Sequence, residues 1–261
     1  MGEKRGKQNI ILLFVGLLGI VIFVSTIALS VVSGCAVEDV VVPSESMESS
    51  SSESESSISS SQSSEPEPPA LPLSEEELFT DALFIGHSCV EGLFVQGYAM
   101  QADFFSAVGM TVHSVFTDAP ARHQSPVTDL LATEKQYSRI FILFGINEVG
   151  TDPTLFIEKY GMLIDHIRQT QPSARIYIQA IFPVSRAAHA RNTYLVNNDN
   201  IRLFNGLIYD MTVDKQVEFL NVYEALVDAE GFLPDDASND GIHLSKNYNQ
   251  IWIDYLKEHV K

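Results

Sequence analysis

Short apolar segments alternate with longer amphipathic segments through residues 74–261 of this 261-residue chain. Five of the apolar segments are five to seven residues long and rich in Phe, Ile, Val and Leu. That length and composition are typical of buried β-strands. We therefore predict strands over 82–86, 103–108, 139–144, 175–181 and 216–222.

Other segments place their apolar residues at the spacing of one helix face. These predicted helices cover 153–170, 198–213 and 246–259. Asp152 and Pro153 supply the N-cap and the first residue expected of the earliest one. Ser74 and Glu77 fit a capping box, which indicates a short helix at the start of the folded part.

The alternation of strands with helices determines the predicted fold class. Parallel strands need a crossover connection, and a helix supplies it by packing back onto the sheet. We predict an α/β fold, a three-layer α/β/α sandwich with a five-stranded, mostly parallel sheet. Residues 74–261 suffice for one such domain. Ligands bind these sheets beyond the carboxyl ends of the strands, so functional residues are sought there.

The amino-terminal segment predicts a membrane attachment. Residues 10–32 are almost wholly apolar and carry no charge, which is long enough for a spanning helix. Val32 to Cys35 also resembles the lipobox of bacterial lipoproteins, so 1–35 is either a membrane anchor, which the length favours, or a lipoprotein signal. Lys4, Arg5 and Lys7 precede the apolar run, which predicts that the rest of the chain lies outside the cytoplasm.

Residues 36–73 have the composition of a disordered linker. Two-thirds of residues 44–64 are serine, glutamates are interspersed, and several prolines follow. Low hydrophobicity with uniform negative charge cannot bury a core and favours a solvated, extended tether. The predicted organisation is thus an anchor or signal over 1–35, a linker over 36–73 and a folded domain over 74–261.

Charge and cysteine content exclude several classes of protein. The formal net charge is −18, of which −12 falls on residues 74–261, and an acidic domain without a basic stripe argues against a nucleic-acid partner. The cysteines are Cys35 and Cys89, which rules out a zinc cluster built from cysteines and a disulfide within the domain.

Four segments near the ends of predicted elements carry candidate chemistry. Ser88 follows the first strand, Gly109 the second, and Asn147 the third. Asp240 lies three residues before His243, ahead of the last predicted helix. At that spacing an aspartate can accept the Nδ1 proton of the histidine and leave Nε2 free to act as a base. Taken singly, each residue is more simply explained as a helix cap, a turn residue or a surface group.

Together and in this order, the four segments resemble the blocks of the SGNH, or GDSL-like, hydrolases across about residues 80–259. The resemblance implies a flavodoxin-like SGNH hydrolase fold, with Ser88 as nucleophile, His243 as general base and Asp240 as its orienting carboxylate. It also implies an oxyanion hole built from the Ser88 amide, the Gly109 amide and the Asn147 side chain, and it implies no cofactor.

The sequence departs from the family pattern at two positions. His87 stands where the family usually has an aspartate before the serine, and Glu148 stands where an aspartate follows the asparagine. We expect His87 to have a structural hydrogen-bonding role rather than a pH-sensing one. We expect Cys89, at the start of a helix, to pack as a small apolar group rather than act as a nucleophile.

The remaining histidines and acidic residues are not assigned to a metal site. His113, His123 and His189 lie in loops, where surface positions that help to shape a substrate rim are expected. Asp235 and Asp236 lie near Asp240, but they lack the spacing and glycine of a calcium loop of the EF-hand type.

We therefore expect a monomeric catalytic domain, tethered to the membrane outside the cytoplasm, that hydrolyses carboxylic esters. The location favours short acyl groups, acetyl above all, on cell-surface carbohydrate as the substrate. A lipase or lysophospholipase, an acyltransferase using the same serine, and an inactive carbohydrate-binding relative remain alternatives.

Overall fold

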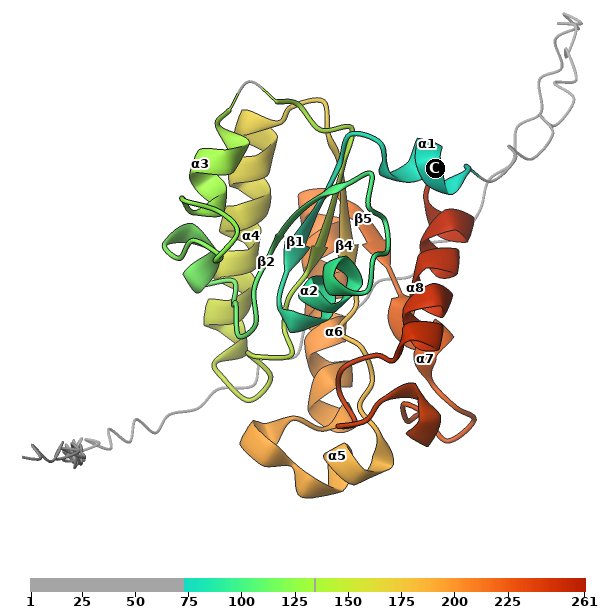
Figure 1. Ribbon diagram of the computed structural model, residues 1–261. Helices are drawn as coiled ribbons and strands as arrows, with labels where there is room; N and C mark the ends of the chain where they lie inside the picture. Colours follow the sequence, from blue (N-terminus) through green and yellow to red (C-terminus); the bar gives the residue numbers. More distant parts are fainter. Residues whose placement is uncertain (1–72, 134) are drawn as a thin grey trace, which may run out of the picture. The chain divides into compact units, whose positions relative to one another are not determined.

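The computed structural model describes residues 73–133 and 135–261, which form an α/β domain (Figure 1). A five-stranded sheet has the order β2-β1-β3-β4-β5, and all its pairings are parallel. The strands are β1 (Ala82–Gly86), β2 (Asp103–Ser106), β3 (Arg139–Leu143), β4 (Arg175–Gln179) and β5 (Glu218–Leu220). The predicted three-layer fold is confirmed.

Helices connect the strands and cover both faces of the sheet. The longer ones are α2 (Ser88–Val95), α4 (Pro153–Thr170), α6 (Asn198–Lys215) and α8 (Lys246–His259). The shorter α-helices are α1 (Glu75–Phe79), α3 (Val127–Leu131), α5 (Arg186–Arg191) and α7 (Val222–Leu226). Single 3₁₀ turns occur at η1 (Ser114–Phe116), η2 (Thr193–Leu195) and η3 (Asp235–Ala237).

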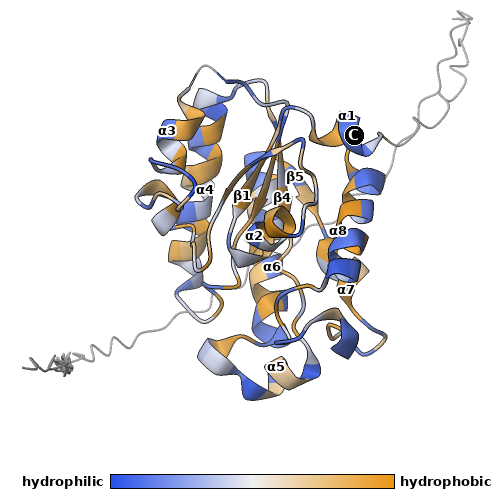
Figure 2. Ribbon diagram, in the orientation of Figure 1, coloured by the Kyte–Doolittle hydropathy of each residue, from blue (hydrophilic) through white to orange (hydrophobic). Residues whose placement is uncertain are grey.

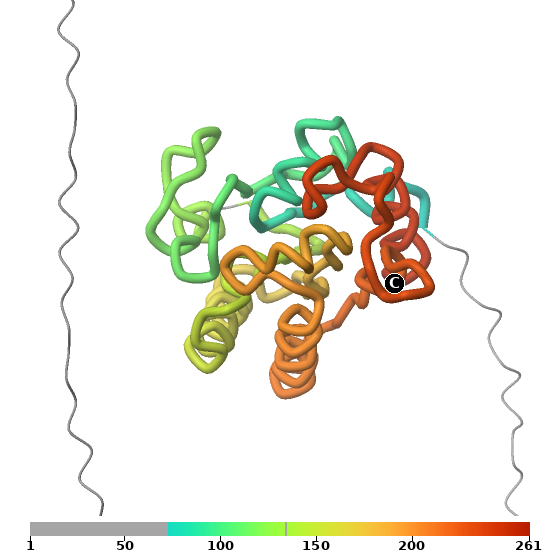
Figure 3. Tube along the Cα trace, turned by 90° about the horizontal axis from the view of Figure 1, so that it is seen from below, coloured from blue at the N-terminus to red at the C-terminus, as the bar shows by residue number. Residues whose placement is uncertain are grey.

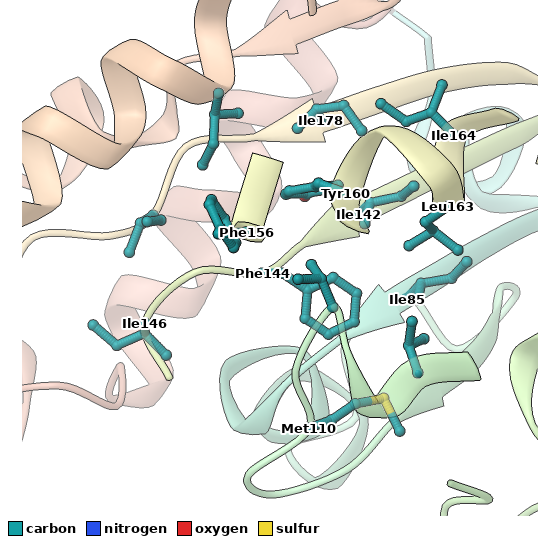
Figure 4. Packing of buried hydrophobic residues seen from close by; sticks show 14 of the residues in the cluster. Ile85, Met110, Ile142, Phe144, Ile146, Phe156, Tyr160, Leu163, Ile164 and Ile178 are labelled. Carbon is teal, nitrogen blue, oxygen red and sulfur yellow. The ribbon is translucent and has the colours of Figure 1, made fainter. Parts of the chain in front are cut away.

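Alternate residues of each strand enter different cores, as the two-residue period of a strand requires. In β1, Leu83 and Ile85 pack in one core with residues of α3, α4 and α6, whereas Phe84 packs in the other with α1, α2, α7 and α8. Figure 4 shows part of the first core, where Phe144, Phe156 and other apolar side chains converge. Figure 3 shows α4 and α6 side by side over that face.

Aromatic rings form a row across the strands in the second core. The rings of Phe104, Phe84, Phe141 and Tyr177 lie on neighbouring strands with centroids 5.1, 4.7 and 5.2 Å apart, and each pair is close to parallel. Such pairs stabilise a sheet beyond the area they bury. In Figure 2 the sheet is largely hydrophobic, whereas the helices that cover it carry both hydrophobic and hydrophilic residues.

The elements match the predictions closely in place and less closely in length. The helix over Pro153–Thr170 and the one over Lys246–His259 have the predicted bounds, and the capping box at Ser74 is present. α6 extends two residues beyond the predicted 198–213. Four strands end earlier than predicted, because apolar residues continue past the strand ends: Ile181 packs in the core beyond β4, and Val108 is an exposed loop residue beyond β2.

The predicted anchor and most of the predicted linker lie outside the residues that the structure describes. Within residues 73–133 and 135–261, no helix combines the length and the apolarity that a membrane crossing needs.

Candidate active site

Ser88 lies at the carboxyl edge of the sheet, where β1 passes directly into α2. The strand ends at Gly86, His87 is the N-cap, and Ser88 is the first helical residue. The His87 ring accepts a hydrogen bond through Nδ1 from the Cys89 amide at 3.2 Å. The hydroxyl is therefore held at the amino end of a helix, where free amide groups and the helix dipole favour negative charge.

His243 joins Ser88 to Asp240 by hydrogen bonds. The Nε2 atom of His243 lies 2.7 Å from Ser88 Oγ, and Nδ1 lies 2.6 Å from Asp240 Oδ2. Because an ionised carboxylate only accepts, Nδ1 carries the proton and Nε2 is free to accept the serine hydroxyl proton. These residues have the geometry of a nucleophile, a general base and the group that orients the base.

Asp240 is fixed by donors on several sides. Its Oδ1 atom accepts from the amides of Ile242 and His243, both at 2.9 Å, and from Ser238 Oγ at 3.0 Å. Partial burial opposes the charge, but the hydrogen bonds, above all those from His243, outweigh it and hold the pKa of Asp240 below its usual range. Arg191 donates to the Asp240 backbone carbonyl at 2.8 Å, a contact that no sequence motif indicated.

The loops that carry Gly109 and Asn147 meet beside the end of β1. The register pairs Gly86 of β1 with Ser106 of β2 and with Leu143 of β3, so the loops following these strands start as neighbours. Asn147 Nδ2 donates to the carbonyl of Met110 at 2.9 Å, and Gly109 has a positive φ of 78°. One amide hydrogen of Asn147 therefore ties the loops together and leaves the other for a ligand.

Glu148 also connects the loops after β2 and β3 by hydrogen bonds. Its Oε1 atom accepts from the Val112 amide at 2.7 Å, and Oε2 accepts from the Gly145 amide at 3.1 Å. Burial raises the pKa of Glu148 to about 7, although the backbone donors lower it. This bridging role of Glu148 has no local sequence signature, because its partner Val112 is distant in sequence.

Cys89, His123 and His189 have supporting positions, and His189 lies in α5 rather than in the predicted loop. Cys89 is buried in the second core, and burial, with a further contribution from Asp240, raises the pKa of its thiol to about 12, so it is not an ionised nucleophile at neutral pH. His123 and His189 are half-buried rather than fully exposed. His123 Nε2 lies 2.6 Å from the Phe104 carbonyl, and His189 Nδ1 accepts from the Asn198 amide at 3.2 Å.

A cluster around Arg122 braces the first turn of α2 and was not predicted. Arg122 pairs with Glu91, donates to Ser106 Oγ at 3.1 Å and lies over the Phe94 ring at 4.0 Å from its centroid. Glu91 also accepts from Ser106 Oγ at 2.9 Å. The Glu91 carboxylate, one turn after Ser88, is thus neutralised by a neighbour. Among the residues described, no three His, Cys, Asp or Glu side chains are grouped as metal ligands.

The five-stranded parallel sheet and its flanking helices define a three-layer, flavodoxin-like α/β/α protein, in which a serine at the carboxyl edge of the sheet is hydrogen-bonded to a histidine and through it to an aspartate. Residues 84–251 match the model of the GDSL-like lipase/acylhydrolase family. The chain belongs to that family, so the resemblance noted in the sequence is confirmed. A search of curated proteins finds no match.

Solved structures show the same fold at low sequence identity. A Streptococcus pneumonia protein provisionally described as a platelet activating factor is 21% identical, with a TM-score of 0.57 over 72% of this chain and 89% of that one. A provisionally described SGNH hydrolase from Slackia heliotrinireducens is 15% identical, with a TM-score of 0.53 over 69% and 98% of the two chains. A GDSL-like lipase from Bacteroides thetaiotaomicron is 16% identical, with a TM-score of 0.50 over 68% and 85%.

Proposed function

We propose that this protein is a serine esterase that hydrolyses carboxylic esters of short acyl groups through Ser88, His243 and Asp240. The observation that carries the proposal is the unbroken path of hydrogen bonds from Ser88 Oγ through both ring nitrogens of His243 to the Asp240 carboxylate. Membership of the acylhydrolase family supports the reaction class.

In the first half-reaction, Ser88 Oγ attacks the ester carbonyl carbon while its proton passes to His243 Nε2. The resulting imidazolium is stabilised by Asp240, whose low pKa keeps it ionised. The amides of Ser88 and Gly109 and the side chain of Asn147 are the donors proposed for the tetrahedral oxyanion. Collapse returns the Nε2 proton to the departing alkoxide and leaves the acyl group on Ser88.

In the second half-reaction, water takes the place of the alcohol. His243 Nε2 removes a proton from the water as its oxygen attacks the acyl carbon, and then returns that proton to Ser88 Oγ as the acid departs. Electrons and protons balance over the cycle, so no cofactor or metal ion is required by this mechanism.

The deciding experiment compares wild type with Ser88→Ala on a panel of p-nitrophenyl esters. We expect Ser88→Ala to lower kcat by at least about a thousand-fold, because the attacking oxygen is removed. Ser138→Ala is the matched control. Ser138 lies just before β3, at the end of that strand opposite to Asn147, and its hydroxyl donates to the carbonyls of Thr80 and Asp81. Unchanged turnover in Ser88→Ala would contradict the proposal.

Labelling with a fluorophosphonate, combined with product analysis, tests two of the alternatives, the inactive carbohydrate-binding relative and the acyltransferase. A reactive Ser88 forms a covalent adduct in the wild type, whereas an inactive carbohydrate-binding relative does not label and hydrolyses none of the esters. An acyltransferase labels but delivers the acyl group to an added sugar or alcohol in preference to water, which product analysis detects.

We further propose that the domain acts outside the cytoplasm on short acyl groups carried by cell-surface carbohydrate. The support is the uncharged apolar run over 10–32, preceded by Lys4, Arg5 and Lys7, and the acidic linker that follows it. Cell fractionation should recover the full chain with membranes and leave residues 74–261 accessible to external protease. Recovery in the cytoplasm would contradict this location.

A further inference from the structure

An apolar groove begins at Ser88 and follows α2. Its volume is about 330 Å³, and both Ser88 and His243 line it. The lining also includes Gly92 and Val95 of α2, and Val108 from the loop that leads to Gly109. A cavity that includes the nucleophile and the base is where part of an ester substrate must lie.

Gly92 forms the floor of this groove. Ser88, Gly92 and Val95 recur at helical spacing, so they share one face of α2. A Cβ atom added to Gly92 would meet no other atom within 4 Å, so the missing side chain leaves open space. Glycine inside a helix is destabilising relative to alanine, and no close backbone contact explains it at this position. The open space itself is what Gly92 provides.

The walls beside Gly92 are apolar and face solvent. Val95 is 71% exposed and Val108 is 79% exposed, although valine is a residue that folding usually buries. Glu91 also lines the groove, but its carboxylate is paired with Arg122 and hydrogen-bonded to Ser106. Gln96 and Asn249 also line the groove, and their side chains are polar but uncharged. The groove is therefore mostly apolar and has no unpaired carboxylate, which suits a hydrocarbon chain.

We propose that this groove binds the acyl chain of the ester and that the enzyme prefers chains of about four to eight carbons to acetyl. The inference rests on the proposed esterase function and sharpens its substrate class. From Ser88 to Val95 the helix rises about 10 Å, which is roughly the length of an eight-carbon chain. Each methylene buried along that path strengthens binding by up to a factor of about four.

The test measures kcat/KM for p-nitrophenyl acetate, butyrate, hexanoate and octanoate. In the wild type, we expect hexanoate to exceed acetate at least tenfold. Gly92→Leu fills the floor and should lower the hexanoate-to-acetate ratio at least tenfold, and Gly92→Ala should lower it less. Gly206→Leu is the matched control, because Gly206 is also helical, is exposed and has no neighbouring atom within 4 Å of an added Cβ. It should leave the ratio at the wild-type value.

Two results would overturn the groove assignment. One is a Gly92→Leu protein whose chain-length ratio equals that of the wild type. The other is an effect of Gly92→Leu on kcat/KM that appears only with acetate esters of longer alcohols, and not with longer acyl chains. That result would place the alcohol part of the ester in the groove. Circular dichroism establishes that Gly92→Leu is folded, and Gly92→Ala gives the same test with a residue that favours the helix.

Fluorophosphonate labelling of wild-type Ser88 distinguishes failure of the groove assignment from failure of the esterase assignment. If only the groove assignment fails, Ser88 is still labelled; if the esterase assignment fails, it is not.

Discussion

His87 is a buried histidine next to the proposed nucleophile, where the family usually has an aspartate. It is 1% exposed, and its Nδ1 atom caps α2 by accepting from the Cys89 amide. Burial, with a smaller contribution from the charge of His243, lowers the pKa of His87 to about 3. The ring is therefore neutral in the folded protein at neutral pH. His87 therefore caps α2, which is the structural hydrogen-bonding role that we expected from the sequence.

We predict that His87→Asn makes stability less sensitive to acid. In the unfolded chain a histidine has a pKa near 6.5, so below that pH the unfolded state binds a proton that folded His87 does not. The free energy of unfolding of the wild type should fall as the pH falls from 6.5 toward 3. Asparagine can also cap the helix but does not titrate.

Urea unfolding at pH 7, 6 and 5 measures this effect. Between pH 7 and pH 5 the wild type should lose about 2 kcal/mol more than His87→Asn. Comparing the change with pH in each protein removes the constant cost of the smaller side chain. Parallel stability curves for the two proteins would show that folded His87 titrates normally.

Single residues also show what the sequence could and could not predict about the site. Ser88, Asp240 and His243 could be predicted as a group because each belongs to a local motif, and in the structure they are joined by hydrogen bonds. Glu148 and Arg191 were missed as braces, because their partners are set by tertiary contacts. Glu148 reaches the amide of Val112, 36 residues away, and Arg191 reaches the carbonyl of Asp240, 49 residues away.

The loop after β3 depends on a glycine that leaves room for a residue of the neighbouring loop. Gly145 has a φ of 128°, and an added Cβ would lie 2.3 Å from Ile181 Cδ1. Ile181 follows β4, where the apolar run continues past the end of the strand. The apolar residues that extended the predicted strand to residue 181 therefore include Ile181, which packs against the loop that carries Asn147.

We predict that Gly145→Ala lowers both stability and turnover. The added methyl overlaps Ile181 and must displace the loop, which should cost about 1 to 3 kcal/mol beyond the strain of the backbone. Asn147 moves with the loop, so kcat for p-nitrophenyl butyrate should fall. Unfolding in urea and steady-state kinetics measure the two effects.

Gly97→Ala is the control for backbone strain alone. Gly97 also has a positive φ, of 80°, but an added Cβ meets no atom within 4 Å. The difference between the variants therefore isolates the contact with Ile181. Equal losses of stability in both, with turnover unchanged in Gly145→Ala, would show that the loop accommodates the methyl group.

For the domain as a whole, the pattern of apolar residues predicted the three layers but not the order of the strands in the sheet. Alternating strands and helices indicated a parallel sheet with covered faces, because the period of apolar residues records which faces are buried. The strand order β2-β1-β3-β4-β5 has no local signature, since it depends on which side of β1 each crossover takes. The row of rings from Phe104 to Tyr177 likewise follows from register rather than from any segment alone.

The hydrogen bond between Ser88 and His243 joins residues 155 positions apart. Ser88 belongs to the first strand-to-helix turn, whereas His243 precedes α8, which packs against α7 in the second core. During synthesis, Ser88 is therefore made long before His243, the base proposed to activate it. In the proposed mechanism, a partly folded chain has no base beside Ser88, so hydrolysis requires the segment before α8 to be in place. For the esterase proposed above, the onset of ester hydrolysis during refolding would therefore report that the C-terminal segment has docked.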